Sequence, residues 1–246
     1  VAVKLVAPAK KNKELSSGFL YERLETEARA LSRLSHPNIV RLIDYSAGTH
    51  APYLVTEYLG NGKTLHDELI ELVEWNEFYD DQEAWHILNQ VLNAVEAIHD
   101  QGVAHRDLNP NNIMLQSVVG DRRFVRLFDF GLGKLTGAGP DEHALGTPEY
   151  IAPEQLSGHQ SGPKSDIYAI GVLTFTLLEW RSPFFGQTRD QILATKRDVG
   201  CDPPGAIEPG GLDEEARAIY RRAMATDPNQ RYGSIKDLRV ALKRLR

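Results

Sequence analysis

The stretch that decides the fold occupies residues 105–131 and reads HRDLNPNNIMLQSVVGDRRFVRLFDFG. It places Asp107 and Asn112 five positions apart, and Asp129 follows after a short predicted hairpin. Two carboxylates and an amide in this order suit phosphoryl transfer, because one carboxylate must orient the attacking hydroxyl while the amide and the second carboxylate hold magnesium ions on the phosphates. Asp and Gly are also common in turns, so either half of the stretch alone could be a solvated bend. The rest of the chain separates these two interpretations.

The composition is that of a folded domain. With 246 residues, 41% hydrophobic and 25% charged, the chain can bury a sizeable core in one large or two small lobes. The single cysteine, Cys201, excludes an intrachain disulfide, and the longest apolar run, around 170–178, is too short for a membrane span. The net charge of −6 argues against a nucleic-acid binder. We therefore expect an intracellular, cytoplasmic domain without a membrane segment of its own, with a place in a longer or membrane-anchored protein left open.

Apolar spacing predicts most of the scaffold. Residues 82–100 keep helical spacing on one face and predict a buried helix that leads into the stretch above. The acidic residues between 68 and 83 are interpreted as a solvated helix face. Further helices are predicted at 164–180, 213–225 and 234–245, and strands at 39–45 and 52–58.

Several motifs together resemble the catalytic domain of eukaryotic-like serine/threonine protein kinases, especially the bacterial members. They are VAVK at 1–4, HRDLxxxxN at 105–112, DFG at 129–131, GTPEYIAPE at 146–154 and DPNQRYGS at 227–234. The resemblance implies an α+β, bilobal fold, with a small β-rich N-lobe over 1–59 and a helical C-lobe over 60–246. It implies transfer of the γ-phosphate of ATP to Ser/Thr hydroxyls of protein substrates, with Mg²⁺. A glycine-rich GxGxxG strand-turn-strand should precede VAVK, so we expect either a fragment or a protein without that hairpin.

The resemblance assigns the nucleotide side of the site to the first lobe. Lys4 would grip the phosphates, and Glu27 would pair with Lys4, because a carboxylate on the inward side of a helix needs a cation. Thr56 would be the gatekeeper, and the backbone of Glu57 and Leu59 would bind the adenine.

The acceptor side falls on the second lobe. Asp107 would orient the acceptor hydroxyl, Asn112 and Asp129 would bind Mg²⁺, and Thr147 would contact Asp107 and shape the acceptor site. Position 109 departs from the family, since serine/threonine kinases usually carry lysine there and Asn109 brings no charge. Transition-state stabilisation should be weaker as a result.

Further residues are implied in support of the site. His105 is expected to pack against Phe130, with Leu31 and Leu42 completing an apolar stack. A buried Glu154 needs a partner, and the family offers Arg231. Asp166 would hold the loop backbone, although an acid at a helix N-terminus is also favoured by the helix dipole alone.

Regulation is predicted from the residues around Arg106. Such an arginine marks kinases that are ordered by a phosphate on the activation segment. Thr136 is the one plausible regulatory acceptor there, whereas Asp141 and Glu142 could pair with Arg106 without modification, or simply form an acidic loop tip.

Two other functions remain open at this point. A pseudokinase or scaffold domain would explain Asn109 and the missing glycine-rich loop. A small-molecule phosphotransferase of the aminoglycoside-kinase type shares the Asp and Asn logic, but would not be expected to carry GTPEYIAPE together with Asp166 and Arg231. The oligomeric state is not indicated.

Overall fold

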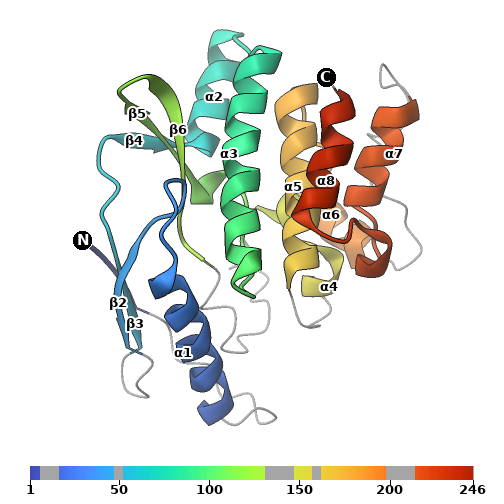
Figure 1. Ribbon diagram of the computed structural model, residues 1–246. Helices are drawn as coiled ribbons and strands as arrows, with labels where there is room; N and C mark the ends of the chain where they lie inside the picture. Colours follow the sequence, from blue (N-terminus) through green and yellow to red (C-terminus); the bar gives the residue numbers. More distant parts are fainter. Residues whose placement is uncertain (6–16, 47–51, 131–146, 157–161, 198–213, 246) are drawn as a thin grey trace.

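The first sheet is a small antiparallel one at the N-terminal end. A computed structural model describes residues 1–5, 17–46, 52–130, 147–156, 162–197 and 214–245 (Figure 1). Within it, β1 (Ala2–Leu5), β2 (Leu42–Ser46) and β3 (Tyr53–Thr56) pair in the order β1-β3-β2. Helix α1 (Ser17–Arg33) packs beside this sheet and buries Ala28 and Leu31. Sheet and helix form the smaller lobe.

The second sheet belongs to the larger lobe. Strands β4 (Gly62–Thr64), β5 (Ile113–Val118) and β6 (Asp121–Leu127) pair antiparallel in the order β4-β5-β6. The β5–β6 hairpin is the one predicted inside 105–131. The predicted lobe boundary after residue 59 lies in the connection between β3 and β4.

Helices form the rest of the larger lobe, and Figure 1 shows α3 and α5 side by side at its centre. Seven side chains of α3 are 0% exposed, which explains the strict apolar spacing of this segment. Together these elements give the bilobal α+β fold that the sequence predicted. The helices are α2 (Leu65–Trp75), α3 (Asp81–Asp100), α4 (Pro153–Leu156), α5 (Pro163–Glu179), α6 (Arg189–Arg197), α7 (Glu214–Ala223) and α8 (Ile235–Leu242), with 3₁₀ turns η1 (Pro110–Asn112), η3 (Pro148–Tyr150), η5 (Pro228–Gln230) and η6 (Lys243–Leu245).

The strand predicted at 39–45 begins later, at Leu42, because the preceding residues bond to the other lobe. The Val40 amide donates to the Leu127 carbonyl at 2.8 Å, and the Leu127 amide donates to the Asn38 carbonyl at 2.8 Å. The Asn38 side chain adds a bond of 2.9 Å to Gln90 of α3. These contacts fasten the smaller lobe to the strand that leads to Asp129.

The interpretation of residues 68–83 as a solvated helix face is wrong at Glu68, which is 7% exposed. Arg123 donates to its carboxylate at 2.8 Å and the Tyr79 hydroxyl donates at 2.9 Å. Burial opposes ionisation, but these hydrogen bonds and the nearby charges of Lys63 and Arg123 hold the pKa of Glu68 below its usual value. Glu68 therefore joins α2 to β6 rather than facing water.

Candidate active site

One buried carboxylate, that of Asp166, holds the backbone of the loop 105–109. Asp166, on the first turn of α5 and 1% exposed, accepts 2.8 Å bonds from the backbone amides of His105 and Arg106 and from the imidazole of His99. Burial alone would raise its pKa, but these donors and the neighbouring histidines hold the pKa of Asp166 below its usual value. The carboxylate therefore stays charged and fixes the loop backbone, as the sequence predicted.

The hydrogen bond to Asp166 helps to hold Arg106 in a strained backbone conformation. Arg106 has a φ of 63° and Asp129 a φ of 56°, in the left-handed region that costs energy for residues other than glycine. Besides its amide bond to Asp166, Arg106 accepts a 2.9 Å bond at its carbonyl from the Gln155 side chain. Two elements distant in sequence thus hold Arg106 in place.

His105 is fully buried and links the loop to the strand before Asp129. Its Nε2 lies 3.2 Å from the Phe128 carbonyl, so Nε2 carries the proton, and its ring centroid lies 4.8 Å from that of Phe130. Burial lowers the pKa of His105, which favours the neutral imidazole. The predicted contact between His105 and Phe130 is present.

The polar residues of the loop bond to one another around Asp107. The Asn112 side chain donates to the Asp107 carbonyl at 2.7 Å, and that of Asn109 donates to the same carbonyl at 2.9 Å and reaches the Asp107 carboxylate at 3.4 Å. Among the described residues, no donor reaches the side-chain oxygen of Asn112, while its nitrogen is bonded to Asp107. The Phe128 amide donates to the Asn112 carbonyl at 3.1 Å, which brings Asn112 next to the strand that ends at Asp129.

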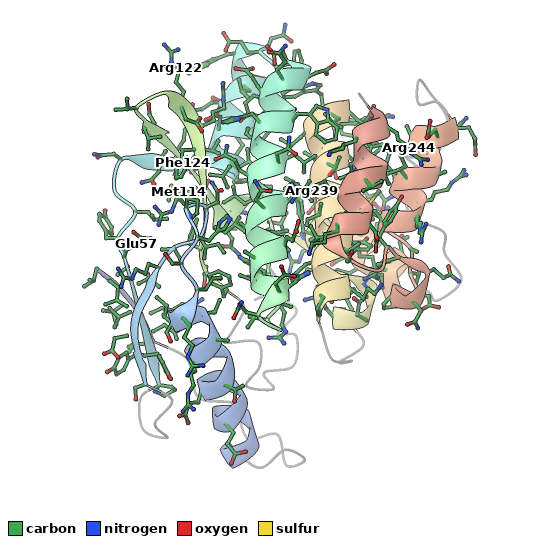
Figure 2. The ribbon with its side chains drawn as sticks, in the orientation of Figure 1. Glu57, Met114, Arg122, Phe124, Arg239 and Arg244 are labelled. Atoms are coloured by element: carbon green, nitrogen blue, oxygen red, sulfur yellow. The ribbon has the colours of Figure 1, made fainter. Side chains whose placement is uncertain are left out.

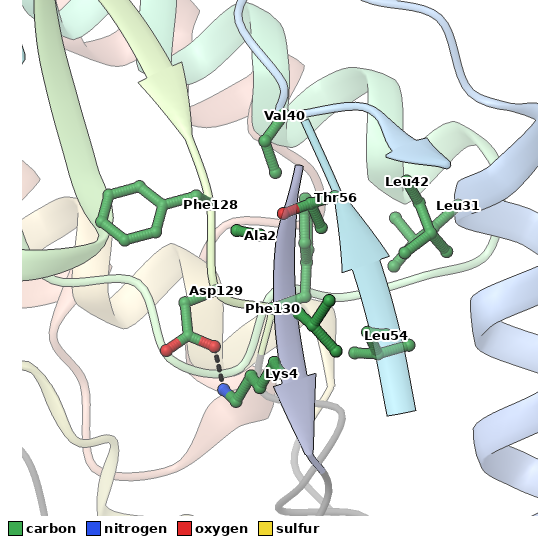
Figure 3. A pocket seen from close by; sticks show the side chains of 11 residues that line it. Ala2, Lys4, Leu31, Val40, Leu42, Leu54, Thr56, Phe128, Asp129 and Phe130 are labelled. Carbon is green, nitrogen blue, oxygen red and sulfur yellow. Dashed lines mark hydrogen bonds and ion pairs between the residues drawn. The ribbon is translucent and has the colours of Figure 1, made fainter. Parts of the chain in front are cut away.

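A cavity of about 210 Å³ lies between the lobes, and Lys4 and Asp129 form an ion pair at its wall (Figure 3). These two residues are 125 positions apart in sequence. The cavity is mostly apolar, and Leu31, Leu42 and Phe130 of the predicted stack all face it. The lining residues are Ala2, Val3, Lys4, Leu31, Val40, Leu42, Leu54, Thr56, Phe128, Asp129 and Phe130.

Thr56, the predicted gatekeeper, lines this cavity at the end of β3, and the predicted hinge follows it. Figure 2 shows Glu57 where the chain leaves the first sheet. The Glu57 carboxylate pairs with Arg126 of β6 and accepts a 2.7 Å bond from the Arg41 amide, while the Glu57 amide donates to the Arg41 carbonyl at 3.0 Å. The side chain of Glu57 thus joins the lobes, and Leu59 packs against the core.

Residues 147–154, which follow the undescribed range, are fixed at both ends. Thr147 accepts a 3.1 Å bond from the side chain of Asn111. Glu154 and Arg231 form the predicted ion pair through two bonds of 2.8 Å, with side-chain exposures of 11% and 0%. Burial disfavours the charge of Glu154, but the Arg231 guanidinium holds its pKa below the usual range.

Other predicted residues fall outside the part of the chain that the structure describes. Thr136, Asp141 and Glu142 lie in the undescribed range 131–146, and Glu27 lies on α1 with its side chain undescribed. The pairing of Lys4 with Glu27 therefore stays a prediction, and the described partner of Lys4 is Asp129.

Comparison with known proteins identifies the family. The family model described as the protein kinase domain matches residues 1–240. The chain belongs to the protein kinase domain family. This kinase domain is 36% identical over 228 residues to serine/threonine-protein kinase Pkn1 of Myxococcus xanthus, covering 91% of this chain and 32% of the relative. It is 35% identical over 235 residues to calcium/calmodulin-dependent protein kinase type 1 of Macrobrachium nipponense, covering 94% of this chain and 64% of the relative.

The fold agrees with solved kinase domains. The crystal structure of the Mycobacterium tuberculosis PknI kinase domain matches with a TM-score of 0.69 at 24% identity, covering 99% of this chain and 85% of that one. The kinase domain spans only 32% and 64% of the length of the two curated relatives named above. Protein kinase domains use ATP, a divalent metal ion and a protein substrate. In the described residues, no helix is long and apolar enough to cross a membrane.

Sequence reasoning missed two cations, the half-buried Arg126 and the buried Lys196. Arg126 alternates with the buried residues of β6, and its partner Glu57 lies 69 positions away. Lys196 follows Ile192 at the i+4 position on the inward face of α6, and this spacing was the one signal of its burial.

Proposed function

We propose that this protein transfers the γ-phosphate of ATP to Ser/Thr hydroxyls of protein substrates. The observation that carries the proposal is the ion pair of Lys4 with Asp129 at the cavity between the lobes. It brings the cation of the VAVK strand and the carboxylate of the DFG motif to one place. When ATP binds, its phosphate oxygens would bind Lys4, and the Asp129 carboxylate would bind the metal ion instead.

On the nucleotide side, Lys4 supported by Glu27 positions the phosphates of ATP. The backbone after Thr56 binds the adenine, and since the amide of Glu57 is already bonded to Arg41, its carbonyl is the group that Glu57 offers. Leu59 provides the second backbone contact of this hinge.

The metal site consists of Asn112 and Asp129. A carboxylate and an amide oxygen are ligand types that Mg²⁺ prefers, and the Asn112 side-chain oxygen accepts no bond from the described residues while its nitrogen donates to Asp107. Asn112 and Asp129 would hold the Mg²⁺ ion beside the phosphates, where its charge would neutralise the negative charge that develops during transfer.

On the acceptor side, Asp107 orients the hydroxyl and accepts its proton. Asn109 donates toward Asp107 instead of bringing a positive charge, so this loop supplies less stabilisation to the transferred phosphate than a lysine would. Thr147 shapes the place of the acceptor residue from the facing segment, where Asn111 holds its hydroxyl.

Regulation forms a separate part of the proposal. Asp141 and Glu142 pair with Arg106 in place of a phosphate, so that activity does not require phosphorylation of Thr136. A charge-assisted contact to a desolvated arginine contributes roughly 1.5–3 kcal/mol, which is enough to order a short loop. Thr136→Ala should then leave turnover nearly unchanged, whereas the double change Asp141→Asn, Glu142→Gln should lower it.

The proposal is tested with the full-length protein, γ-labelled ATP and a generic protein substrate. We expect label on serine or threonine after hydrolysis of the product, and none with Asp129→Asn. The Asp100→Asn variant, which makes the same change at an exposed aspartate at the end of α3, serves as a matched control and should keep full activity. Transfer by Asp129→Asn at the unmodified rate, or label on tyrosine alone, would overturn the proposal.

A further inference from the structure

A lysine is buried on helix α6 and bonds only to backbone carbonyls within the described residues. The Lys196 ammonium donates to the carbonyls of Pro148, Glu149 and Ile151 at 2.8, 2.6 and 2.7 Å. Lys196 is 5% exposed, and its nitrogen also lies 4.7 Å from the ring centroid of Tyr168 and 4.5 Å from that of Phe184.

The surroundings of this ammonium match its chemistry closely. An ammonium has three N–H donors, and each of the three reaches one carbonyl oxygen. Two aromatic rings, those of Tyr168 and Phe184, add cation–π attraction at this buried position. Burial lowers the pKa of Lys196 well below its usual value, so the carbonyls and rings are what keep a charged group here tolerable.

The three carbonyls belong to a short segment in a special position. The turn η3 (Pro148–Tyr150) follows Thr147 directly, and α4, which carries Glu154, comes next. Thr147 is bonded to Asn111 of the loop below, and Glu154 is anchored to Arg231. Residues 147–154 are thus held at both ends, at Thr147 by Asn111 and at Glu154 by the predicted pair with Arg231, and Lys196 holds the middle.

We propose that Lys196 is a positioning residue that sets the backbone of residues 148–151 for the protein acceptor. This inference rests on the proposed function, in which Thr147 shapes the acceptor site. Without the ammonium, the three carbonyls would lose the one donor that the described residues give them, and the segment would have to rearrange next to Thr147. Since none of the residues that Lys196 bonds or stacks on lines the cavity of Lys4 and Asp129, ATP should be bound as before.

The experiment compares Lys196→Met, which keeps the length and apolar volume of the side chain, with Lys196→Arg, which keeps the charge and donors. Lys236→Met is the matched control, because Lys236 is an exposed lysine on α8 whose removal changes the net charge equally. For each variant, kcat and the KM values for ATP and for an acceptor peptide are measured, with the Kd for ATP from calorimetry.

We expect Lys196→Met to lower kcat/KM for the peptide at least tenfold, while KM and Kd for ATP stay within twofold of their original values. Lys196→Arg should recover a large part of the loss, and Lys236→Met should show none. Equal changes in the constants for peptide and ATP, or kinetics of Lys196→Met like those of the control, would overturn the proposal. In the latter case Lys196 would contribute only to the stability of the core.

A second readout does not depend on turnover. In hydrogen exchange, the amides of residues 149–152 should exchange at least tenfold faster in Lys196→Met, while those of α3 stay protected. If the unmodified protein proved inactive, the proposed function would fail, and this exchange rate would still decide the role of Lys196. Unchanged exchange at 149–152 would refute it.

Discussion

The charge of Asp166 is predicted to hold the catalytic loop, and Asp166→Asn removes that charge with little change of shape. One oxygen accepts from the Arg106 amide, and the other accepts from both the His105 amide and His99. An asparagine can keep the first bond, but its NH₂ group would then face two donors. Hydrogen bonds to a charged group contribute about 1.5–3 kcal/mol each, so the free energy of unfolding should fall by roughly 3–5 kcal/mol. If the misplaced loop loses about 2.7 kcal/mol of its stabilisation of the transition state, kcat falls about 100-fold.

Urea unfolding followed by circular dichroism measures the first quantity, and steady-state transfer to a peptide measures the second. Asp237→Asn is the control, because Asp237 is also an acid in the first turn of a helix but is exposed. If the helix dipole were the whole reason for Asp166, both variants would lose only about 0.3–1 kcal/mol. Similar small losses in the two variants, with kcat unchanged in Asp166→Asn, would refute the assigned role.

Three further predictions follow from the same contacts. Arg231→Met should lower the free energy of unfolding by about 3–5 kcal/mol, because it leaves Glu154 buried without its cation. Adding Glu154→Leu should restore part of the lost stability. A double variant whose loss equals the sum of the two single losses would contradict this. Asn109→Lys should raise kcat about tenfold, because it places a cation beside Asp107. It should also lower the free energy of unfolding by roughly 1 kcal/mol, because the side-chain cap of η1 is lost. An unchanged kcat in peptide assays would show that the missing charge is unimportant. The pKa values of Glu154 and Asp166 are held low in the folded state. Their stabilising contribution is therefore present above about pH 4.3 and is lost as the pH falls. Urea unfolding between pH 7 and pH 3 should show a declining free energy of unfolding, and a flat profile would contradict this.

The sequence was sufficient for features whose signal is local or whose partner is implied by the family. Helix α3 follows from its apolar spacing, because a fully buried face repeats with the period of the helix. The pair of Glu154 with Arg231 follows from the need of a buried carboxylate for a cation, once the motifs of the family name the candidate.

Features that depend on distant partners were not visible in this way. The acidic run at 68–83 looked solvated because Arg123, which buries Glu68, lies 55 positions further along the chain. The strand predicted from residue 39 starts three residues later because Asn38 and Val40 bond to Leu127 instead of β3. Lys196 gave no motif at all, since its partners are backbone carbonyls, which any sequence provides.

Asp107 is proposed to orient the acceptor hydroxyl for transfer from ATP. The most direct measurement compares the full-length protein with its Asp107→Asn variant, using γ-phosphate transfer to a protein substrate and the Kd for ATP from calorimetry. We expect transfer by the variant to fall to background while the Kd for ATP stays within about twofold, since Asp107 acts on the acceptor side. Transfer at equal rates by both proteins would contradict the account.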